Sequence, residues 1–295
     1  MNLQMSLISS STPFDLDLGL RDTHVLVTGG SGYIGKVVVH AFLAAGCNVT
    51  IVDVSGHCPF NQNDEKVLFK HGDITKSDQM DEIFAEAEQH FGPIETCIAL
   101  ASLDLSVLPQ SESLADVDPK VWQRVFDVNV TGTFMTCQKW LRSIRNAAGD
   151  PEKAAKLKNA SLVIMGSESG RFGVRTMAAY AAGKSAVQYG LMYSLAQDAL
   201  RVHAKARVNA IAPGAVETEL FHKEVAELGR EYYYGECEAT VPLARPVPPE
   251  HVARTILFLA SERYSGSVHG QVLPIDGGKT GSLVWSLGES KEKRP

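Results

Sequence analysis

Short runs of apolar residues recur along the chain, and each ends at glycine or polar residues. His24–Thr28 is the first of these runs, and Ser161–Met165 is equally apolar. Runs without polar alternation predict strands that are buried on both faces, as in a parallel sheet. We therefore expect about seven strands, at residues 24–28, 48–53, 66–70, 94–99, 161–165, 207–212 and 271–275.

Longer amphipathic segments separate these runs. Their apolar residues recur at three- and four-residue intervals, which predicts helices with one buried face. Ser77 can cap the second helix, and Asp118 with Pro119 can cap and open the third. Strands that alternate with helices indicate a doubly wound α/β fold, with a parallel sheet covered on both faces. The expected helices span residues 33–45, 77–90, 119–147, 178–204 and 250–261.

The chain has no interior stretch rich enough in glycine and proline to separate two domains. We expect a single domain over residues 21–280, with an N-terminal extension at 1–20 and a polar C-terminal tail at 281–295. Hydrophobic residues make up 44% and charged residues 21% of the chain, which is typical of a globular protein with a sizeable core.

Charge and composition exclude several classes of function. A formal net charge of −6 argues against a nucleic-acid binder, which needs a basic surface. No apolar run reaches the roughly 18 residues that span a bilayer, and the first residues lack the pattern of a signal peptide. The 5 cysteines are scattered without metal-binding spacing, so we expect no metal and a reducing, cytoplasmic location.

A glycine-rich turn, Thr28–Gly35, follows the first strand directly. Gly30, Gly32 and Gly35 match the pattern G-x-G-x-x-G, which gives a tight turn and lets a pyrophosphate approach the backbone at a helix N-terminus. This turn predicts a Rossmann-like dinucleotide site. Asp53 closes the second strand, where a carboxylate binds ribose hydroxyls and repels a 2′-phosphate, so we favour NAD over NADP.

Tyr180 and Lys184 stand four residues apart, with Ser167 thirteen residues before the tyrosine. On a helix, residues at this spacing share one face. An ammonium beside a phenol lowers the tyrosine pKa, and such a phenol can exchange a proton with a substrate alcohol near neutral pH. The serine hydroxyl could hold the substrate oxygen. These three residues are our candidate catalytic group.

Together, the glycine turn and the Ser167/Tyr180/Lys184 spacing resemble the short-chain dehydrogenase/reductase family, in its single-domain form, over about residues 21–279. Asn129, within Asp127–Gly132, is similar to the asparagine that bends the long fourth helix of the family and holds a water next to the lysine. Further similar stretches are Gly72–Thr75, Gly166–Gly170, Asn209–Thr218 and Gly270–Gly278.

The resemblance implies a hydride-transferring enzyme that interconverts a secondary alcohol and a ketone with NAD or NADP. Tyr180 would be the general acid or base, Lys184 would lower its pKa and bind the nicotinamide ribose, and Ser167 would bind the substrate oxygen. Asn129 completes the catalytic tetrad. The implied cofactor contacts are Thr28, Gly30, Ser31, Gly32, Tyr33, Ile34, Gly35, Asp53, Asp73, Ile74, Ala101, Tyr180, Lys184, Pro213, Gly214, Val216 and Thr218.

Two departures from the family leave alternatives open. Tyr33 occupies a glycine position, which gives the glycine spacing of the extended branch that includes epimerases and dehydratases. Ala99–Ser102 replaces the usual Asn-Asn-Ala-Gly at the end of the fourth strand, which is compatible with a cofactor-binding regulatory protein without turnover. The oxidoreductase remains the leading hypothesis.

The resemblance also implies a lid and an assembly. Residues 217–248 would cover the substrate, a small-molecule alcohol or ketone. Tyr232–Tyr234 could form aromatic walls for the substrate or could pack within a helix. The helices at 119–147 and 178–204 are those that pair in the family, so we expect a homodimer or homotetramer.

Overall fold

The computed structural model describes residues 15–109 and 111–289. Its centre is a seven-stranded parallel sheet in the order β3-β2-β1-β4-β5-β6-β7. The order reverses between β1 and β4, which places a crevice at the carboxyl ends of these two strands. The predicted doubly wound sheet is confirmed. The strands are β1 (His24–Thr28), β2 (Asn48–Asp53), β3 (Val67–His71), β4 (Thr96–Ala99), β5 (Ser161–Met165), β6 (Arg207–Pro213) and β7 (Val272–Ile275).

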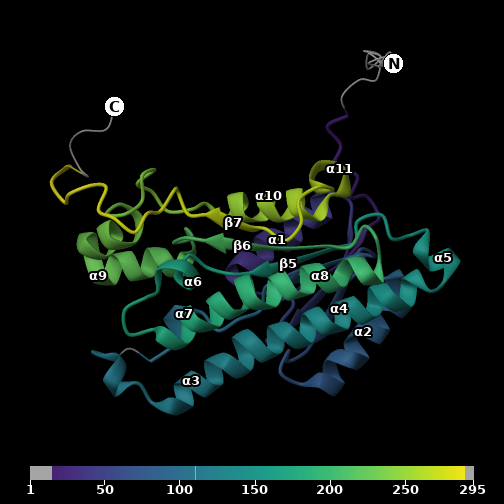
Figure 1. The fold of residues 1–295 in the computed structure, drawn as a ribbon, viewed down its shortest axis with the longest axis horizontal. Helices are drawn as coiled ribbons and strands as arrows, with labels where there is room; N and C mark the ends of the chain where they lie inside the picture. The colour runs from purple at the N-terminus through teal and green to yellow at the C-terminus, as the bar shows by residue number, and fades with distance from the viewer. Residues whose placement is uncertain (1–14, 110, 290–295) are drawn as a thin grey trace, which may run out of the picture.

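Helices cover both faces of the sheet (Figure 1). One face carries α2 (Ser77–Phe91), α4 (Thr133–Ala148) and α8 (Met192–Val202). The other face carries α1 (Tyr33–Ala44) and α10 (Pro249–Ala260). The remaining α-helices are α3 (Pro119–Val125), α5 (Pro151–Ala154), α6 (Ser169–Phe172), α7 (Ala178–Ser185), α9 (Glu219–Cys237) and α11 (Glu262–Ser265).

Each of the two long predicted helices contains a π-helical turn. Phe126–Gly132 joins α3 to α4, and Ala186–Leu191 joins α7 to α8. Such turns are rare and gather at functional sites. They bracket the catalytic candidates, because Asn129 lies in the first and Lys184 stands just before the second.

The two faces have separate cores. On the α2/α4/α8 face, Trp140 is fully buried and its indole N–H donates to the Glu95 carbonyl at 3.2 Å. On the opposite face, Phe42 of α1 and Ile256 of α10 are equally buried. Each such side chain contributes roughly 1.5–3 kcal/mol relative to an exposed position. The sheet is thus fixed from both sides, which makes its carboxyl edge a rigid support for a site.

Helix capping agrees with the sequence at one position and differs at another. Asp118 caps α3 and accepts from Lys120 N at 2.8 Å, as predicted. The prediction that Ser77 caps α2 is wrong, because Lys76 occupies the cap and Ser77 is the first helical residue. The Ser77 hydroxyl instead accepts from Lys139 Nζ of α4 at 3.3 Å. A tertiary contact has therefore replaced the local cap.

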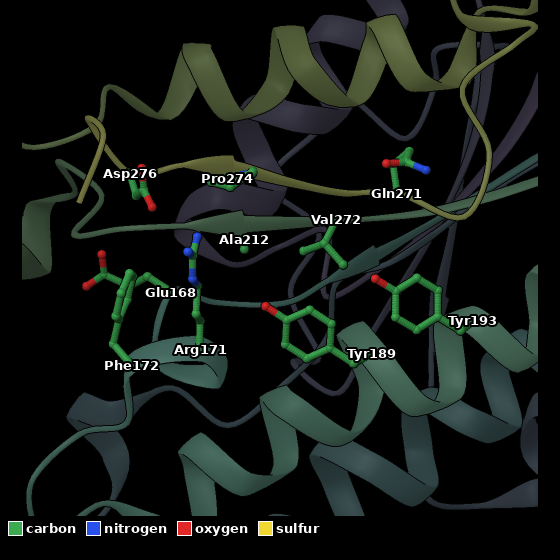
Figure 2. Close-up of a pocket in the computed structure, with 10 residues that line it drawn as sticks. All are labelled: Glu168, Arg171, Phe172, Tyr189, Tyr193, Ala212, Gln271, Val272, Pro274 and Asp276. Carbon is green, nitrogen blue, oxygen red and sulfur yellow. The ribbon is translucent and has the colours of Figure 1, made fainter. Parts of the chain in front are cut away.

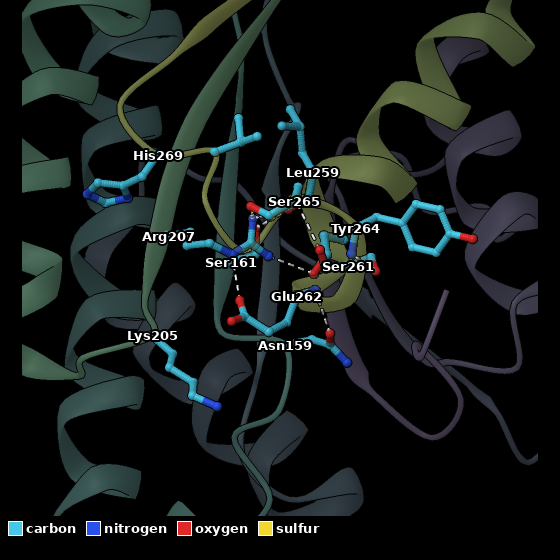
Figure 3. Close-up of polar contacts among 12 residues, drawn as sticks. Asn159, Ser161, Lys205, Arg207, Leu259, Ser261, Glu262, Tyr264, Ser265 and His269 are labelled. Carbon is cyan, nitrogen blue, oxygen red and sulfur yellow. Dashed lines mark hydrogen bonds and ion pairs between the residues drawn. The ribbon is translucent and has the colours of Figure 1, made fainter. Parts of the chain in front are cut away.

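Arg207 organises the amino end of the sheet (Figure 3). Arg207 is 2% exposed. Its guanidinium donates to the Leu259 carbonyl at 2.7 Å and to the Ala260 carbonyl at 3.1 Å. It also donates to the Ser265 hydroxyl at 2.8 Å and pairs with Glu262 at 3.0 Å. These bonds tie β6 to the end of α10 and to α11, far from the carboxyl edge.

Both ends of the described chain pack on the domain. Leu20 is buried, and the Ser261 hydroxyl donates to the Leu18 carbonyl at 2.5 Å. Residues 1–14 of the expected N-terminal extension and residues 290–295 of the expected tail lie outside the described residues. Val284 N donates to the Ala239 carbonyl at 2.7 Å, which joins the tail to the chain after α9. No helix in residues 15–109 and 111–289 has the length and apolar character to cross a bilayer.

Candidate active site

The glycine turn lies at the carboxyl end of β1, next to the start of α1. Gly29 has φ +72°, and a Cβ there would stand 2.8 Å from the Ala101 Cα. A Cβ on Gly35 would stand 2.1 Å from the Gly29 carbonyl oxygen, so the turn and the helix can pack only with glycine. Gly32 is the N-cap of α1 and provides no side-chain cap. The N–H groups of the first turn therefore suit a phosphate.

Asp53 lies beside this turn at the end of β2. Its two carboxylate oxygens accept from Ser31 N at 2.9 Å and from Ser55 N at 2.8 Å. Gly29 N donates to the Val52 carbonyl at 2.7 Å and fixes the turn against the same strand end. A carboxylate held in this way has a defined orientation and keeps further acceptor capacity for ribose hydroxyls.

Asp73 and Ile74, two of the predicted cofactor contacts, follow β3. The Asp73 carboxylate accepts from the Thr75 N–H and hydroxyl, both at 2.8 Å. Ile74 is 6% exposed, and its side chain packs against Gly132 in the π-helical turn. The side chain of Ile74 thus belongs to the core, and its contact with the cofactor stays a prediction.

A threonine holds the strand end that lacks the family's asparagines. Leu100 N and Ala101 N donate to the Thr28 hydroxyl at 3.1 and 3.2 Å. That hydroxyl lies 3.4 Å from the Ile98 carbonyl, which it can reach as a donor. Thr28 therefore joins the ends of β1 and β4 at the crevice, where Ala99–Ser102 replaces the family's Asn-Asn-Ala-Gly.

Tyr180 and Lys184 lie on α7 and are buried, at 7% and 2% exposed. The Lys184 ammonium lies 5.6 Å from the centre of the Tyr180 ring. It donates to the Met165 carbonyl at 3.0 Å and to the Ser102 hydroxyl at 3.2 Å. The helix thus places both side chains at the carboxyl end of β5, as their spacing predicted. We did not predict Ser102 as a site residue. Its position, where the family's Asn-Asn-Ala-Gly has glycine, could have indicated it.

The pKa values differ from the expectation for this pair. Burial raises the pKa of Tyr180 well above its ordinary value; nearby Asp104 adds to the rise and Ser167 opposes it. Burial lowers the pKa of Lys184 to about 8, although Asp104 favours its charged form. The expected lowering of the tyrosine pKa by the lysine is therefore absent in this structure. The cost of burying the phenolate exceeds any stabilisation of it by the Lys184 ammonium, which already donates to a carbonyl and a hydroxyl.

Ser167 stands at the end of β5 and is 8% exposed. Its amide donates to Gln188 Oε1 at 2.8 Å, and its hydroxyl lies 3.0 Å from the Ser169 hydroxyl. Ser169 N also donates to the Ser167 hydroxyl at 3.2 Å. Gln188 was missed as a support for the serine. Its signal is its position four residues after Lys184, on the same side of the helix.

Asn129 is 1% exposed and lies in the first π-helical turn. Its side chain accepts from Leu103 N at 2.7 Å and donates to the Leu103 carbonyl at 3.1 Å. Its own carbonyl accepts from the Thr133 hydroxyl at 2.8 Å. The side chain therefore fixes the loop after β4, next to Ser102. Its expected link to Lys184 through a water stays a prediction.

The segment after β6 continues this edge. Gly214 N donates to the Ile275 carbonyl at 3.0 Å, and Val216 pairs with Val247 in an isolated bridge. The Thr218 hydroxyl accepts from Phe221 N at 3.1 Å and caps α9. Pro213, Gly214, Val216 and Thr218 thus form a strip that leads from the sheet edge into α9, the expected lid.

Apolar side chains surround the phenol. Tyr180 belongs to a cluster with Leu108, Val125, Met177 and Ala179. Among the expected aromatic walls of the lid, two tyrosines use their hydroxyls for packing within the protein. Tyr232 donates to Glu224 at 2.8 Å, and Tyr234 donates to the Trp285 carbonyl at 2.6 Å.

Three comparisons with known proteins agree with this geometry. A family model described as enoyl-(acyl carrier protein) reductase matches residues 31–280. The 3-oxoacyl-[acyl-carrier-protein] reductase MabA of Mycobacterium tuberculosis is 30% identical, with 86% of this chain and 91% of that protein covered. The corresponding reductase FabG of Thermotoga maritima is 31% identical, with 86% and 96% covered. A short-chain dehydrogenase of Leptospira borgpetersenii with bound NAD+ superimposes with a TM-score of 0.73 at 25% identity, covering 88% of this chain and 92% of that one.

The sheet, the glycine turn and the Tyr/Lys pair define a nicotinamide-dependent oxidoreductase of Rossmann type. The chain belongs to the short-chain dehydrogenase/reductase family. It is thus an enzyme of the class that acts on CH–OH groups or ketones with NAD or NADP. The predicted family is confirmed. Within the described part of the chain, no three His, Cys, Asp or Glu side chains gather into a potential metal site.

Proposed function

We propose that this enzyme interconverts a secondary alcohol and a ketone, with Tyr180 as the proton donor and acceptor. The observation that carries the proposal is the meeting of Tyr180, Lys184 and the Ser167 hydroxyl at the carboxyl end of β5. Only β4 separates this strand from β1, which leads into the glycine turn. The residues of the turn fit a dinucleotide, because its glycines and free helix N–H groups provide a phosphate cradle. When bound, the nicotinamide supplies or accepts the hydride.

The protein's own residues would handle the proton and the substrate oxygen. In the direction of reduction, the Tyr180 hydroxyl donates a proton to the oxygen that becomes the alcohol. Its raised pKa keeps the phenol protonated at neutral pH, as this direction requires. The Ser167 hydroxyl donates a hydrogen bond to the same oxygen and stabilises the charge that develops there. Lys184 and Asn129 would lead the replacement proton in from the loop after β4.

The cofactor is proposed to be NAD rather than NADP. Asp53 supports this choice, since an oriented carboxylate at the end of β2 would repel a 2′-phosphate. The Leptospira neighbour was solved with NAD+. Initial rates with NADH and NADPH, or with NAD and NADP, test the preference directly. A higher kcat/KM with the phosphorylated cofactor would contradict it.

Substrates with apolar surroundings at the reacting carbon are proposed, because apolar side chains line the neighbourhood of Tyr180. Relatives include an acetoacetyl-CoA reductase and a 2-(S)-hydroxypropyl-CoM dehydrogenase besides the two acyl-carrier-protein reductases. A panel should therefore contain 3-oxoacyl thioesters, simple secondary alcohols, polyols and cyclic alcohols. Formation or consumption of reduced nicotinamide, followed by its absorbance, is the readout.

The same panel separates two other functions. The glycine spacing at Tyr33 favours an epimerase or dehydratase, which would convert its substrate without net change in the nicotinamide. The Ala99–Ser102 replacement favours a cofactor-binding regulatory protein, which would bind the dinucleotide without turnover. Net oxidation or reduction of the cofactor supports the dehydrogenase over both.

A homodimer or homotetramer is proposed. Tyr193 and Leu200 on α8, together with Phe134 on α4, are 46%, 49% and 43% exposed although they are large and apolar. Pairing of these helices with a second copy would cover them. Light scattering coupled to size-exclusion chromatography tests the assembly, and a monomer at micromolar concentration would exclude it.

A cytoplasmic location is proposed. All 5 cysteines of the chain are free and buried, which suits a reducing compartment. Localisation of a tagged protein by microscopy or fractionation tests this proposal.

A further inference from the structure

A buried ion pair begins one residue after Ser167. Glu168 Oε1 bonds to Lys279 Nζ, with the two side chains 10% and 17% exposed. Glu168 N donates to the Pro213 carbonyl at 2.9 Å, so the residue is held at both its backbone and its side chain. The pair therefore joins the serine loop, which includes α6, to the segment after β7.

The second oxygen of this carboxylate is buried and bonds to no group in the described parts of the chain. A Cβ on Gly214 would stand 2.9 Å from this oxygen and 3.1 Å from the Asp276 Cα, so the carboxylate presses against the strip after β6. Glu168 also lines a pocket of about 190 Å³ with Arg171 and Asp276 (Figure 2). A buried carboxylate oxygen without a hydrogen bond destabilises the fold, which argues that Glu168 has a functional role at this position.

Lys279 also faces the lid. Glu236, near the end of α9, has its pKa raised by burial, and Lys279 opposes that rise. Next to Lys279, Thr280 N donates to the Thr240 carbonyl at 2.9 Å, just after α9. One ammonium thus serves a carboxylate on the serine loop and a carboxylate on the lid.

We propose that Lys279 and Glu168 form a positioning pair that couples the docking of α9 to the orientation of Ser167. When α9 is docked, Lys279 pairs with Glu168, favours the ionised form of Glu236 and holds the serine loop in place. When α9 moves away, Lys279 loses one partner and the loop loses its support. Glu168 is a positioning residue, which acts through Ser167. The inference rests on the proposed alcohol–ketone chemistry.

The charges around Glu168 support this coupling. Burial raises the pKa of Glu168 to about 7; Lys279 lowers it, whereas Glu236 from α9 and Asp276 from the end of β7 raise it. Two carboxyls therefore oppose the ionisation of Glu168, and the one ammonium of Lys279 favours it. Loss of Lys279 would leave Glu168 buried without compensation, and a carboxyl in that condition takes up a proton.

The test compares Lys279→Met, Lys279→Arg, Glu168→Gln and the double variant Glu168→Gln/Lys279→Met. Lys205→Met removes an exposed lysine at the opposite end of the sheet and is the matched control. We expect Lys279→Met and Glu168→Gln each to lower kcat/KM by about tenfold to a hundredfold, which is the cost of a misplaced catalytic group. The double variant should be no worse than either single one, and Lys279→Arg should retain most activity. Below pH of about 7, wild-type activity should fall with protonation of Glu168, and Glu168→Gln should lack that limb.

Hydrogen exchange gives a readout that needs no turnover. Amides of residues 219–240 should exchange faster in Lys279→Met than in Lys205→Met, because α9 has lost a contact. If Lys279→Met matches Lys205→Met in kcat/KM and in exchange, the coupling is overturned. If the singles combine additively in the double variant, it is overturned as well. If the wild type turns over no alcohol or ketone, the proposed function fails, and the exchange experiment still decides the coupling of α9 to Glu168.

Discussion

The ammonium of Lys184 lies 5.6 Å from the centre of the Tyr180 ring and donates its hydrogen bonds to groups other than the phenol. The Met165 carbonyl and the Ser102 hydroxyl receive them, so β5 and the loop after β4 fix the lysine. The pair is thus arranged in advance of any substrate. Burial raises the pKa of Tyr180, so the phenol is protonated at neutral pH, which suits the proton donor that we propose for reduction.

Tyr180→Phe should abolish hydride transfer and leave cofactor binding intact. The substitution removes only the hydroxyl, and loss of a general acid costs about 10²–10⁴ in rate. Turnover should be measured with the best alcohol or ketone, and dinucleotide binding by calorimetry. Tyr264→Phe, on α11 at the opposite end of the sheet, is the control. Undiminished turnover in Tyr180→Phe would show that Tyr180 does not take part in proton transfer.

Ser102→Ala should move the alkaline limb of the activity profile to lower pH. The hydroxyl accepts from the Lys184 ammonium and so favours its charged form, while burial already lowers the lysine pKa to about 8. Without that acceptor the pKa falls further. A lost hydrogen bond to a charged group costs about 1.5–3 kcal/mol, which corresponds to one to two pH units. Profiles of kcat/KM between neutral and alkaline pH check the shift, and an unchanged limb would contradict it.

Asp53→Asn should shift cofactor preference toward NADP. The amide keeps an acceptor for Ser31 N or Ser55 N, but it removes the negative charge that opposes a 2′-phosphate. Two unit charges a few ångströms apart near a surface interact by roughly 1–4 kcal/mol, so the ratio of the two dissociation constants should change about tenfold or more. Asp198→Asn, on the exposed face of α8, controls for net charge. Equal ratios in both variants would show that Asp53 does not select the cofactor.

His24 should make the fold sensitive to acid. Its Nδ1 lies 2.8 Å from the Gly92 carbonyl and donates to it. In the neutral ring, Nε2 then accepts from the Thr50 hydroxyl at 2.9 Å. Burial lowers its pKa from 6.5 to about 4. The unfolded chain therefore binds more protons in this window, and stability falls as pH drops from about 6.5 to about 4, by up to ~3 kcal/mol.

His24→Gln should flatten this dependence, although it lowers stability at pH 7. The measurement is the free energy of unfolding in urea at pH 7, 6 and 5. His251→Gln, at an exposed position on α10, should leave the wild-type slope unchanged. A wild-type slope retained in His24→Gln would assign the acid sensitivity to other groups.

Local patterns predicted the scaffold because each depends on near neighbours in the chain. The apolar run His24–Thr28 is β1 itself, and Asp118 caps α3 as its residue type suggests. Where a distant partner competes, local patterns fail. The Ser77 hydroxyl accepts from Lys139 of α4 instead of capping α2. The helices at 119–147 and 178–204 contain π-helical turns that periodicity does not reveal.

The candidate site divides in the same way. The spacing of Ser167, Tyr180 and Lys184 places them together, because a helix and a strand end fix their positions. The sign of the Tyr180 pKa shift could not follow from spacing, since it depends on burial against loops remote in sequence. Neither could the pairing of Glu168 with Lys279, which lie 111 residues apart.

The order of residues alone was thus enough to predict the doubly wound sheet, the glycine turn and the candidate catalytic group, since these depend on periodicity, glycine geometry and helix spacing. The tertiary structure decided the electrostatics. Folding removes Tyr180, Lys184, His24 and Glu168 from water and assigns each its neighbours, and the cost of that desolvation sets their protonation.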